Sequence, residues 1–323
     1  MKKISRIFIR LPNWIGDVCM SLSSLNAVIG SGRKVVICAK PWAQGLLAGY
    51  SANSKVEFLA ISGKWRDDAR KIHQYRKAHP VPHSEVGLLL PDSLSSALCF
   101  KFAGLSSAGY KDDGRSLLLS WPVKKSKPKP HAVESWFYLT RSALTEWGYS
   151  CIAEPKSTVL LPLTAEQLAE KEAFLSRHGL QKGKFILIAP TAVGLHKGKN
   201  KVWQGYEQLT RSLQALGHKV IMCPPPNEVN QAKANAPSAT LLPALSLGAF
   251  AALLKDAALV ICNDSGVSHI AAAANARQIT LIGVTDVKNT GPWSPHALIL
   301  GENGRWPEQE EVLTAVQGRL TEV

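Results

Sequence analysis

The sequence lacks the features that mark several large classes of protein. Among its 323 residues, no apolar run reaches the roughly 20 residues that a membrane-spanning helix needs. The apolar stretch after the basic N-terminus is too short for a signal peptide and is read as a first strand. The six cysteines form no CxxC pair, which argues against a zinc site and predicts reduced thiols in the cytoplasm.

Several cofactor and partner motifs are also missing. There is no GxGxxG fingerprint, which argues against a nicotinamide dehydrogenase, and segment 194–200 falls one residue short of a P-loop. No Asp-x-Asp is present, so a metal bridging a nucleotide diphosphate has no obvious ligands, and we expect no metal and no other cofactor. The basic runs are not interleaved with aromatic residues, so no nucleic-acid partner is expected.

Acidic residues are scarce, because 24 Asp and Glu face 38 Lys and Arg, for a net charge of +14. This balance favours an anionic partner such as a phosphorylated substrate or an anionic membrane face. One basic cluster, in the proline-rich loop 122–130, consists of Lys124, Lys125, Lys127 and Lys129. A second cluster lies at 197–201. Each is either an ordinary solvated loop or a surface that meets phosphates.

What the chain does contain is an alternation of hydrophobic runs and helical patterns from end to end. Strands are predicted at 6–11, 34–39, 56–61 and 86–90, weakly near 108–110 and 117–119, and again at 184–189, 219–223, 257–262 and 278–284. Helices are predicted at 15–29, 65–78, 93–103, 133–147, 165–178, 206–216, 228–236, 247–255, 267–276 and 307–320.

Two successive series of this kind predict two parallel-sheet α/β domains, here placed at 1–155 and 156–323. The final helix, 307–320, either stays with the second domain or packs back on the first. Ligands of parallel sheets bind beyond the carboxyl ends of the strands, so two facing domains would place the site in the cleft between them.

The segment 261–275 carries the strongest single signal. An apolar strand stops at Asn263-Asp264-Ser265-Gly266, and a helix of small residues begins at once. The unpaired N–H groups of a helix N-terminus at the mouth of a sheet suit a phosphate or diphosphate. His269 lies one helical turn beyond Ser265. The alternative is a plain helix N-terminus capped by Asp264 or Ser265.

Three further positions follow predicted strands. Asp17, at the start of the helix after the first strand, is a candidate general base, or else an acidic residue that caps that helix or offsets its dipole. A strand ending near Thr191 leads into a basic loop with Lys201, which is a plausible phosphate cradle. Glu228 could bind ribose hydroxyls, or it could lie in the first turn of a helix capped by Asn227.

Together these motifs resemble those of the heptosyltransferases of glycosyltransferase family nine. The segments that carry the resemblance are Leu11-Pro-Asn-Trp-Ile-Gly-Asp17, Leu90-Pro-Asp-Ser-Leu-Ser-Ser-Ala97, Phe102-Ala-Gly-Leu105 and 263–275. It implies a GT-B fold, with two Rossmann-like domains, and inverting, metal-independent transfer of heptose from ADP-heptose to the inner core of lipopolysaccharide. It also implies a cytoplasmic enzyme peripheral to the inner membrane, whose partners are a nucleotide-sugar, a phosphorylated core acceptor and the anionic leaflet.

The resemblance assigns roles to the candidate residues. Asp17 would be the general base on the acceptor hydroxyl. The donor would be bound by Thr191 and Lys201 at phosphate, Glu228 at ribose, Asp264 at sugar hydroxyls with His269 nearby, and Ser265 and Gly266 at the diphosphate through backbone N–H groups.

The chain departs from the family pattern in places. The usual Pro-Gly-Ala is Pro190-Thr191-Ala192, and the Pro of Lys-x-Trp-Pro is Gln204. The usual Tyr-Gly-Pro-Ser-Ser is replaced at 282–286, near the expected sugar region. Two alternatives therefore stay open: the same fold with another nucleotide-sugar or acceptor, and a non-catalytic nucleotide-binding module docked to a membrane or partner.

Overall fold

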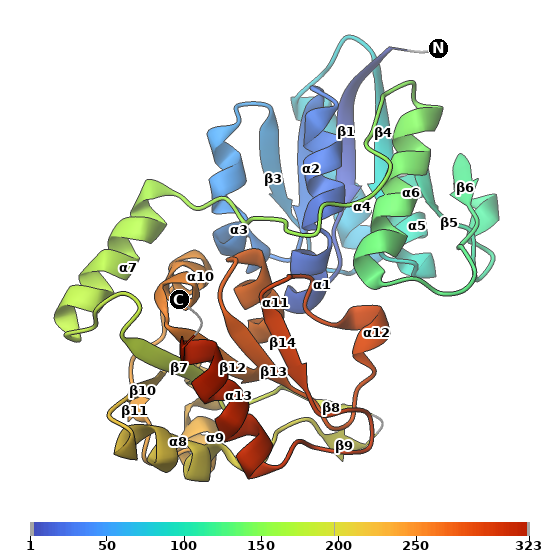
Figure 1. The fold of residues 1–323 in the computed structure, drawn as a ribbon. Helices are drawn as coiled ribbons and strands as arrows, with labels where there is room; N and C mark the ends of the chain where they lie inside the picture. The colour runs from blue at the N-terminus through green and yellow to red at the C-terminus, as the bar shows by residue number, and fades with distance from the viewer. Residues whose placement is uncertain (1–2, 197, 322–323) are drawn as a thin grey trace. The chain divides into compact units, whose positions relative to one another are not determined.

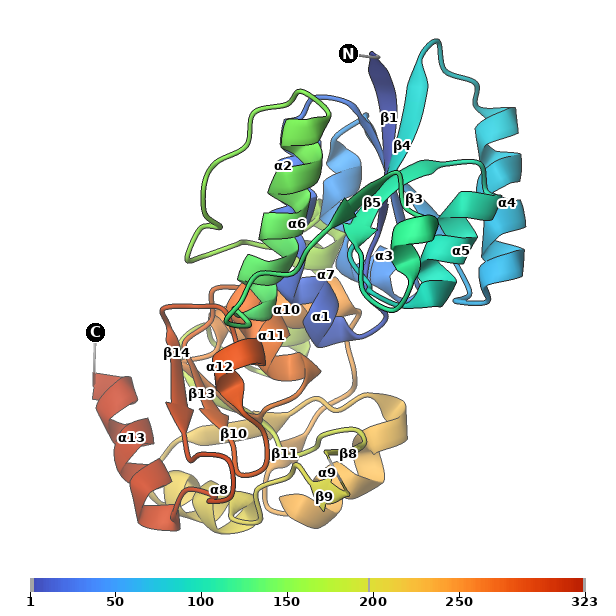
Figure 2. The same cartoon turned by 90° about the vertical axis from the view of Figure 1, so that its right-hand side faces the viewer.

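The computed structural model describes residues 3–196 and 198–321, and it divides the chain into two compact units, Met1–Lys156 and Ser157–Val323. Each unit holds one six-stranded parallel sheet with helices on both faces (Figures 1 and 2). The expected class, α/β with two Rossmann-like parallel sheets, is confirmed.

The first unit has the strand order β3-β2-β1-β4-β5-β6. Its elements are β1 (Ile4–Arg10), α1 (Ile15–Met20), α2 (Leu22–Gly30), β2 (Lys34–Ala39), α3 (Ala43–Leu46), η1 (Ala48–Ala52), β3 (Val56–Ala60), α4 (Trp65–Ala78), β4 (Ser84–Leu89), α5 (Leu94–Phe102), β5 (Ser106–Tyr110), η2 (Arg115–Leu117), β6 (Trp121–Val123) and α6 (Ala132–Glu146). Helices α2 and α6 pack together on one face of the sheet, and α4 and α5 on the other (Figure 2).

The second unit repeats the same order with β11-β10-β7-β12-β13-β14. Its elements are α7 (Ala165–Arg177), β7 (Phe185–Ala189), β8 (Leu195–His196), β9 (Lys199–Asn200), α8 (Tyr206–Ala215), β10 (Lys219–Met222), η3 (Pro226–Glu228), α9 (Val229–Asn235), β11 (Thr240–Leu241), α10 (Leu247–Asp256), β12 (Leu259–Asn263), α11 (Gly266–Ala273), β13 (Gln278–Leu281), α12 (Val287–Thr290), β14 (Ala297–Leu300) and α13 (Gln309–Thr321). Strands β8 and β9 form a small antiparallel hairpin of their own.

Alternate side chains of the second sheet face α8, α9 and α13, which is the period of two expected of strands. The central strands contribute pairs such as Ile186 with Ile188 and Leu259 with Ile261 to this core. Val312 and Val316 of α13 are buried in the same core. The buried residues of the final helix therefore lie in the core of its own unit, which is the first of the two placements considered for it.

The predicted helix over 15–29 is two helices in the structure. Ser21 separates α1 from α2, and its hydroxyl donates a 2.8 Å hydrogen bond to the carbonyl oxygen of Val18. A serine that bonds back to the preceding turn in this way competes with the helical ladder. Asp17 therefore sits on a short helix of its own.

The strand predicted near 117–119 is wrong. Asp113 and Gly114 adopt left-handed backbone conformations, with φ of 54° and 74°, and the chain continues into η2. The strand comes later, as β6, and it contains Pro122. Because β6 lies at the edge of the sheet, the missing N–H of proline leaves no hydrogen bond of the ladder unmade.

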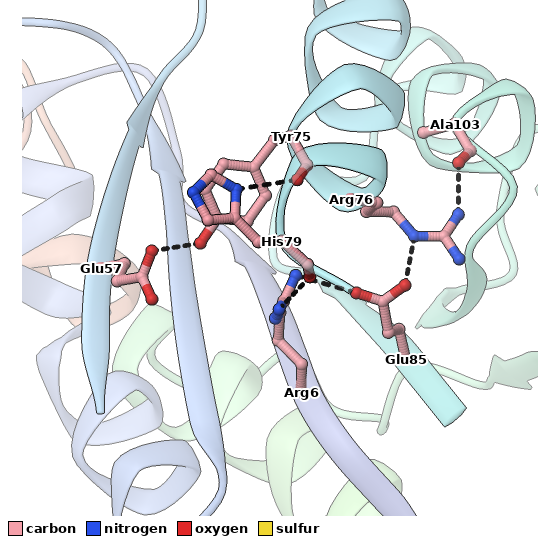
Figure 3. A network of polar contacts seen from close by, with 7 residues as sticks. All are labelled: Arg6, Glu57, Tyr75, Arg76, His79, Glu85 and Ala103. Atoms are coloured by element: carbon pink, nitrogen blue, oxygen red, sulfur yellow. Dashed lines mark hydrogen bonds and ion pairs between the residues drawn. The ribbon is translucent and has the colours of Figure 1, made fainter. Parts of the chain in front are cut away.

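A buried charge network ties the elements of the first unit together at the end of the sheet where β1 begins (Figure 3). Arg6 of β1 and Arg76 of α4 both contact the Glu85 carboxylate of β4, at 3.1 and 2.6 Å. Arg6 also donates to the carbonyl oxygen of His79, and Arg76 to that of Ala103. The network joins β1, β4 and the ends of α4 and α5, and the apolar pattern of the sequence gave no sign of it.

Candidate functional site

The two sheets share one strand order, and this order determines where a ligand can bind. In sheets of order 3-2-1-4-5-6, ligands bind beyond the carboxyl ends of the two central strands, where the direction of winding reverses. In the first unit that point lies between β1 and β4, and in the second between β7 and β12. Asp17 follows β1, Thr191 follows β7, and 264–266 follow β12.

The loop after β1 is held by Arg10, the last residue of that strand. Its buried guanidinium donates to the carbonyl oxygen of Leu11 and, at 2.6 Å, to Oδ1 of Asn13. The Leu11 N–H donates a 3.0 Å bond to the carbonyl oxygen of Cys38. The loop that leads to Asp17 is therefore anchored by polar contacts along its length.

Asp17 lies in the first turn of α1 and is half-buried. The N-cap residue is Trp14, and no side chain caps this helix, so Asp17 is not a cap. Burial raises the pKa of the Asp17 carboxyl, because desolvation penalises its charged form. In the described part of the chain no hydrogen bond or ion pair holds this carboxylate, which leaves it able to accept a proton.

In the second unit the structure joins two of the predicted residues. The hydroxyl of Thr191, which is buried after β7, donates to Oε2 of Glu228. The N-cap residue of α9 is Glu228 and not Asn227, and no side chain caps this helix. Thr191 and Glu228 thus form one polar pair beyond the carboxyl ends of β7 and β10.

The turn after β12 holds the predicted diphosphate site. Ser265 is the N-cap of α11, and its hydroxyl accepts a 3.3 Å hydrogen bond from the Val267 N–H. Among the described residues, no protein acceptor faces the N–H groups of Ser265 and Gly266, so both remain available for an anion. Oδ1 of Asp264 lies 4.0 Å from Nε2 of His269, which places these two predicted residues side by side.

Asn263, which sequence reasoning gave no role of its own, organises this turn. Its fully buried amide donates to the carbonyl oxygens of Ala189 and Thr191, each at 3.3 Å. Its Oδ1 accepts a 3.0 Å hydrogen bond from the Trp203 N–H. The sequence did carry a signal for this role, since Asn263 is a polar residue at the end of an otherwise apolar strand. A buried amide at such a position must find hydrogen-bond partners.

Lys201 is brought to this turn by the same contact. Trp203 is a core residue, with its indole N–H donating to the carbonyl oxygen of Pro307. Since two residues of chain span at most about 7 Å, Lys201 lies close to the Asn263 turn. Lys199 lies on strand β9 and is exposed. Lys197 of the same basic segment lies outside the described residues.

Two contacts define segment 282–286, which keeps the glycine of the usual Tyr-Gly-Pro-Ser-Ser at Gly283. A Cβ atom on Gly283 would lie 2.1 Å from the ring of Trp306, so only glycine fits against this indole. Asp286 caps α12, its Oδ1 accepting a 3.0 Å hydrogen bond from the Lys288 N–H.

The four lysines of the first basic cluster are all exposed, but they are not equivalent. Lys125 forms ion pairs with Asp92 at 2.6 Å and Asp112 at 2.8 Å. Within the described ranges, no such partner engages Lys124, Lys127 or Lys129. Within this cluster, as the structure describes it, these three ammonium groups are therefore the ones free to meet phosphates.

Two features are absent from the described residues. Across 3–196 and 198–321, no three His, Cys, Asp or Glu side chains gather as a metal ion would require. Metal independence nevertheless stays a prediction. In the same ranges, every helix is too short or too polar to cross a membrane.

Comparisons with known proteins agree on one family. A sequence profile of glycosyltransferase family 9 (heptosyltransferase) matches residues 82–317. Lipooligosaccharide heptosyltransferase 2 of Haemophilus influenzae is 27% identical over 309 residues, which cover 90% of this chain and 86% of that protein.

Two solved structures share the fold. The ADP-heptose LPS heptosyltransferase II of Escherichia coli aligns with a TM-score of 0.75 at 21% identity, over 98% of each chain. The E. coli heptosyltransferase WaaC, solved with ADP, aligns with a TM-score of 0.73 at 21% identity, over 97% of this chain and 99% of that one.

Proposed function

Because the chain belongs to glycosyltransferase family 9 (heptosyltransferase), we propose that it transfers L-glycero-D-manno-heptose from ADP-heptose to the inner core of lipopolysaccharide. The observation that carries this proposal is the family match over residues 82–317. The Haemophilus relative supports a heptose donor and a lipooligosaccharide acceptor, and WaaC, solved with ADP, supports ADP as the nucleotide.

The reaction is a single displacement with inversion. Asp17 takes the proton from the acceptor hydroxyl, whose oxygen attacks the anomeric carbon of heptose. The bond from that carbon to the diphosphate oxygen breaks, and its electron pair leaves with ADP. The position of Asp17 beyond the end of β1, its half-buried carboxylate with no hydrogen-bond partner among the described residues, and its raised pKa support this role.

The second unit binds the donor and receives the charge of the leaving group. The N–H groups of Ser265 and Gly266, together with the Lys201 ammonium, hold the diphosphate, which is electrostatic stabilisation of the departing charge. The Thr191 and Glu228 pair supplies one hydroxyl and one carboxylate for the phosphate and the ribose.

The proposed mechanism needs no metal, because Lys201 and the α11 N-terminus neutralise the diphosphate. We therefore expect transfer to survive EDTA at full rate, measured beside a magnesium-supplemented control. A loss of activity that magnesium restores would contradict this charge arrangement.

The experiment that tests the function is a donor and acceptor matrix. Purified protein is offered ADP-, UDP-, GDP- and CMP-sugars, with transfer to heptose-truncated lipopolysaccharide followed by mass spectrometry. Transfer of one heptose from the ADP-sugar alone is expected. Transfer from another nucleotide-sugar would move the proposal to a different donor, and binding without transfer would favour a non-catalytic module.

A further inference from the structure

Among the large hydrophobic side chains of the described structure, that of Trp14 is the second most exposed, with 73% of its surface accessible. Single exposed hydrophobic residues are common, so exposure alone says little. What distinguishes Trp14 is its place, because it is the N-cap residue of α1, directly beyond the carboxyl end of β1. It therefore lies at the position where a parallel sheet of this order binds its ligand.

The backbone that carries this indole is held in place. Asn13, the preceding residue, is fixed by Arg10, and the carbonyl oxygen of Trp14 accepts a 2.9 Å hydrogen bond from the Val18 N–H. In contrast, within the ranges that the structure describes, no ring contact or hydrogen bond occupies the indole itself. A rigid backbone that presents an unoccupied aromatic face is preorganised to bind a ligand.

Asp17 lies one helical turn away. Trp14 is the N-cap and Asp17 the third helical residue, which are the positions where, in a capping box, each side chain bonds the backbone N–H of the other residue. No such box forms here, so the pair offers a flat apolar surface beside a carboxylate.

We propose that the indole of Trp14 is the platform on which a pyranose ring of the acceptor stacks, so that its reacting hydroxyl is held beside Asp17. This inference rests on the proposed function. The apolar C–H face of a sugar ring packs on an aromatic plane, while its hydroxyl groups point outward from the ring edge. Trp14 is then a specificity-determining residue that recognises a sugar face by shape and polarity.

The test compares Trp14→Ala and Trp14→Phe with the wild type, using a lipid-free core oligosaccharide as acceptor. We expect Trp14→Ala to raise the KM for this acceptor about 3- to 10-fold and Trp14→Phe to raise it less, since a smaller aromatic ring remains. The KM for the donor should not change. Leu117→Ala is the matched control, because Leu117 is 88% exposed at the end of η2 in the same unit and its loss should have no effect on the acceptor KM.

Two results would overturn the inference. One is an acceptor KM within twofold of the wild-type value in a Trp14→Ala variant that still turns over. The other is a defect seen only with lipid-bearing acceptor in vesicles, which would make Trp14 a membrane contact. If the wild type transfers no heptose at all, the proposed function fails, and titration of the oligosaccharide against wild type and Trp14→Ala still decides the stacking.

Discussion

For Asp17, stability and chemistry favour different charge states. Burial favours the neutral carboxyl, whereas a general base must be ionised. Its carboxylate is half-buried on a short helix, and burial raises its pKa. A base must be ionised to accept a proton, so the rate should rise with pH through this raised pKa. We expect the acid limb of the kcat/KM profile to lie above the usual aspartate pKa of about 3.9.

Asp17→Asn should lower turnover at neutral pH by about 100-fold or more while preserving donor affinity. Because the folded protein holds the proton more tightly than the unfolded chain, ionisation of Asp17 destabilises the fold above its pKa. The melting temperature of the asparagine variant should therefore equal or exceed that of the wild type at pH 7. Any excess should vanish in acid, where Asp17 is protonated. Transfer assays and thermal melts check both parts, and near-normal turnover would remove Asp17 from the mechanism.

Lys201 and Lys199 offer a matched pair, because Lys199 lies on β9 and Lys201 directly follows that strand. Lys201→Ala should weaken ADP binding by about 1.5–3 kcal/mol, the value of hydrogen bonds to charged groups. Lys199→Ala should change it much less, because only Lys201 is two residues from the Trp203 contact with Asn263. Calorimetric titration with ADP distinguishes them, and a dominant effect of Lys199 would show that β9, and not the segment after it, meets the phosphates.

At this scale the sequence identified residue types better than their partners. Asp264 and Ser265 were both candidates for the cap of α11, since short polar residues before a helix have that local role, and Ser265 is the one that caps it. The bond between Thr191 and Glu228 joins residues 37 positions apart, and the ties of Asn263 span 60 positions or more. Such contacts depend on which strands become neighbours, and local pattern alone does not determine that.

At the scale of elements, prediction succeeded where one strong pattern filled one element. The bounds of β2 and α4 are those expected, because a buried run and an amphipathic repeat each begin and end sharply. Short pieces were missed, as with β14 and β6, where sheet pairing outweighs weak local preference. The break at Ser21 was missed because its hydroxyl acts on a neighbouring turn.

The charge network of Figure 3 leads to a prediction about the first unit. Glu85→Gln removes the charge that compensates buried Arg6, so it should lower the free energy of unfolding by about 3–5 kcal/mol. Asp67→Asn is the matched control, because its pair with Arg70 is exposed and worth at most about 1 kcal/mol.

Urea denaturation measures this difference, and ADP titration reports on the second unit. Affinity for ADP should not change in Glu85→Gln, because the network lies wholly in the first unit. Equal destabilisation by the two variants would mean that the buried network contributes no more than a surface pair.

At the scale of the whole molecule, the excess of positive charge needs a partner. Each lysine near an anionic membrane contributes about 1 kcal/mol, and salt screens this attraction. Replacing Lys124, Lys127 and Lys129 with glutamine should reduce binding to anionic vesicles and raise the KM for glycolipid acceptor, with donor affinity unchanged.

Lys125→Gln is the internal control for this experiment. Its ammonium is already paired with Asp92 and Asp112, so its loss should affect vesicle binding differently from loss of the free lysines. Co-sedimentation at low and high salt measures the effect. If the triple variant sediments like the wild type at low salt, the cluster is an ordinary solvated loop.

Both units are uninterrupted stretches of the chain, joined once near residue 156. The proposed general base and the proposed stacking tryptophan are encoded before that joint, and every proposed contact to the donor after it. Separate parts of one gene therefore encode the specificity for the acceptor and the specificity for the donor, and selection can act on each independently. A single recombination event at the joint would exchange one of these properties and leave the other intact, which gives such a family a short route to new pairings of sugar and acceptor.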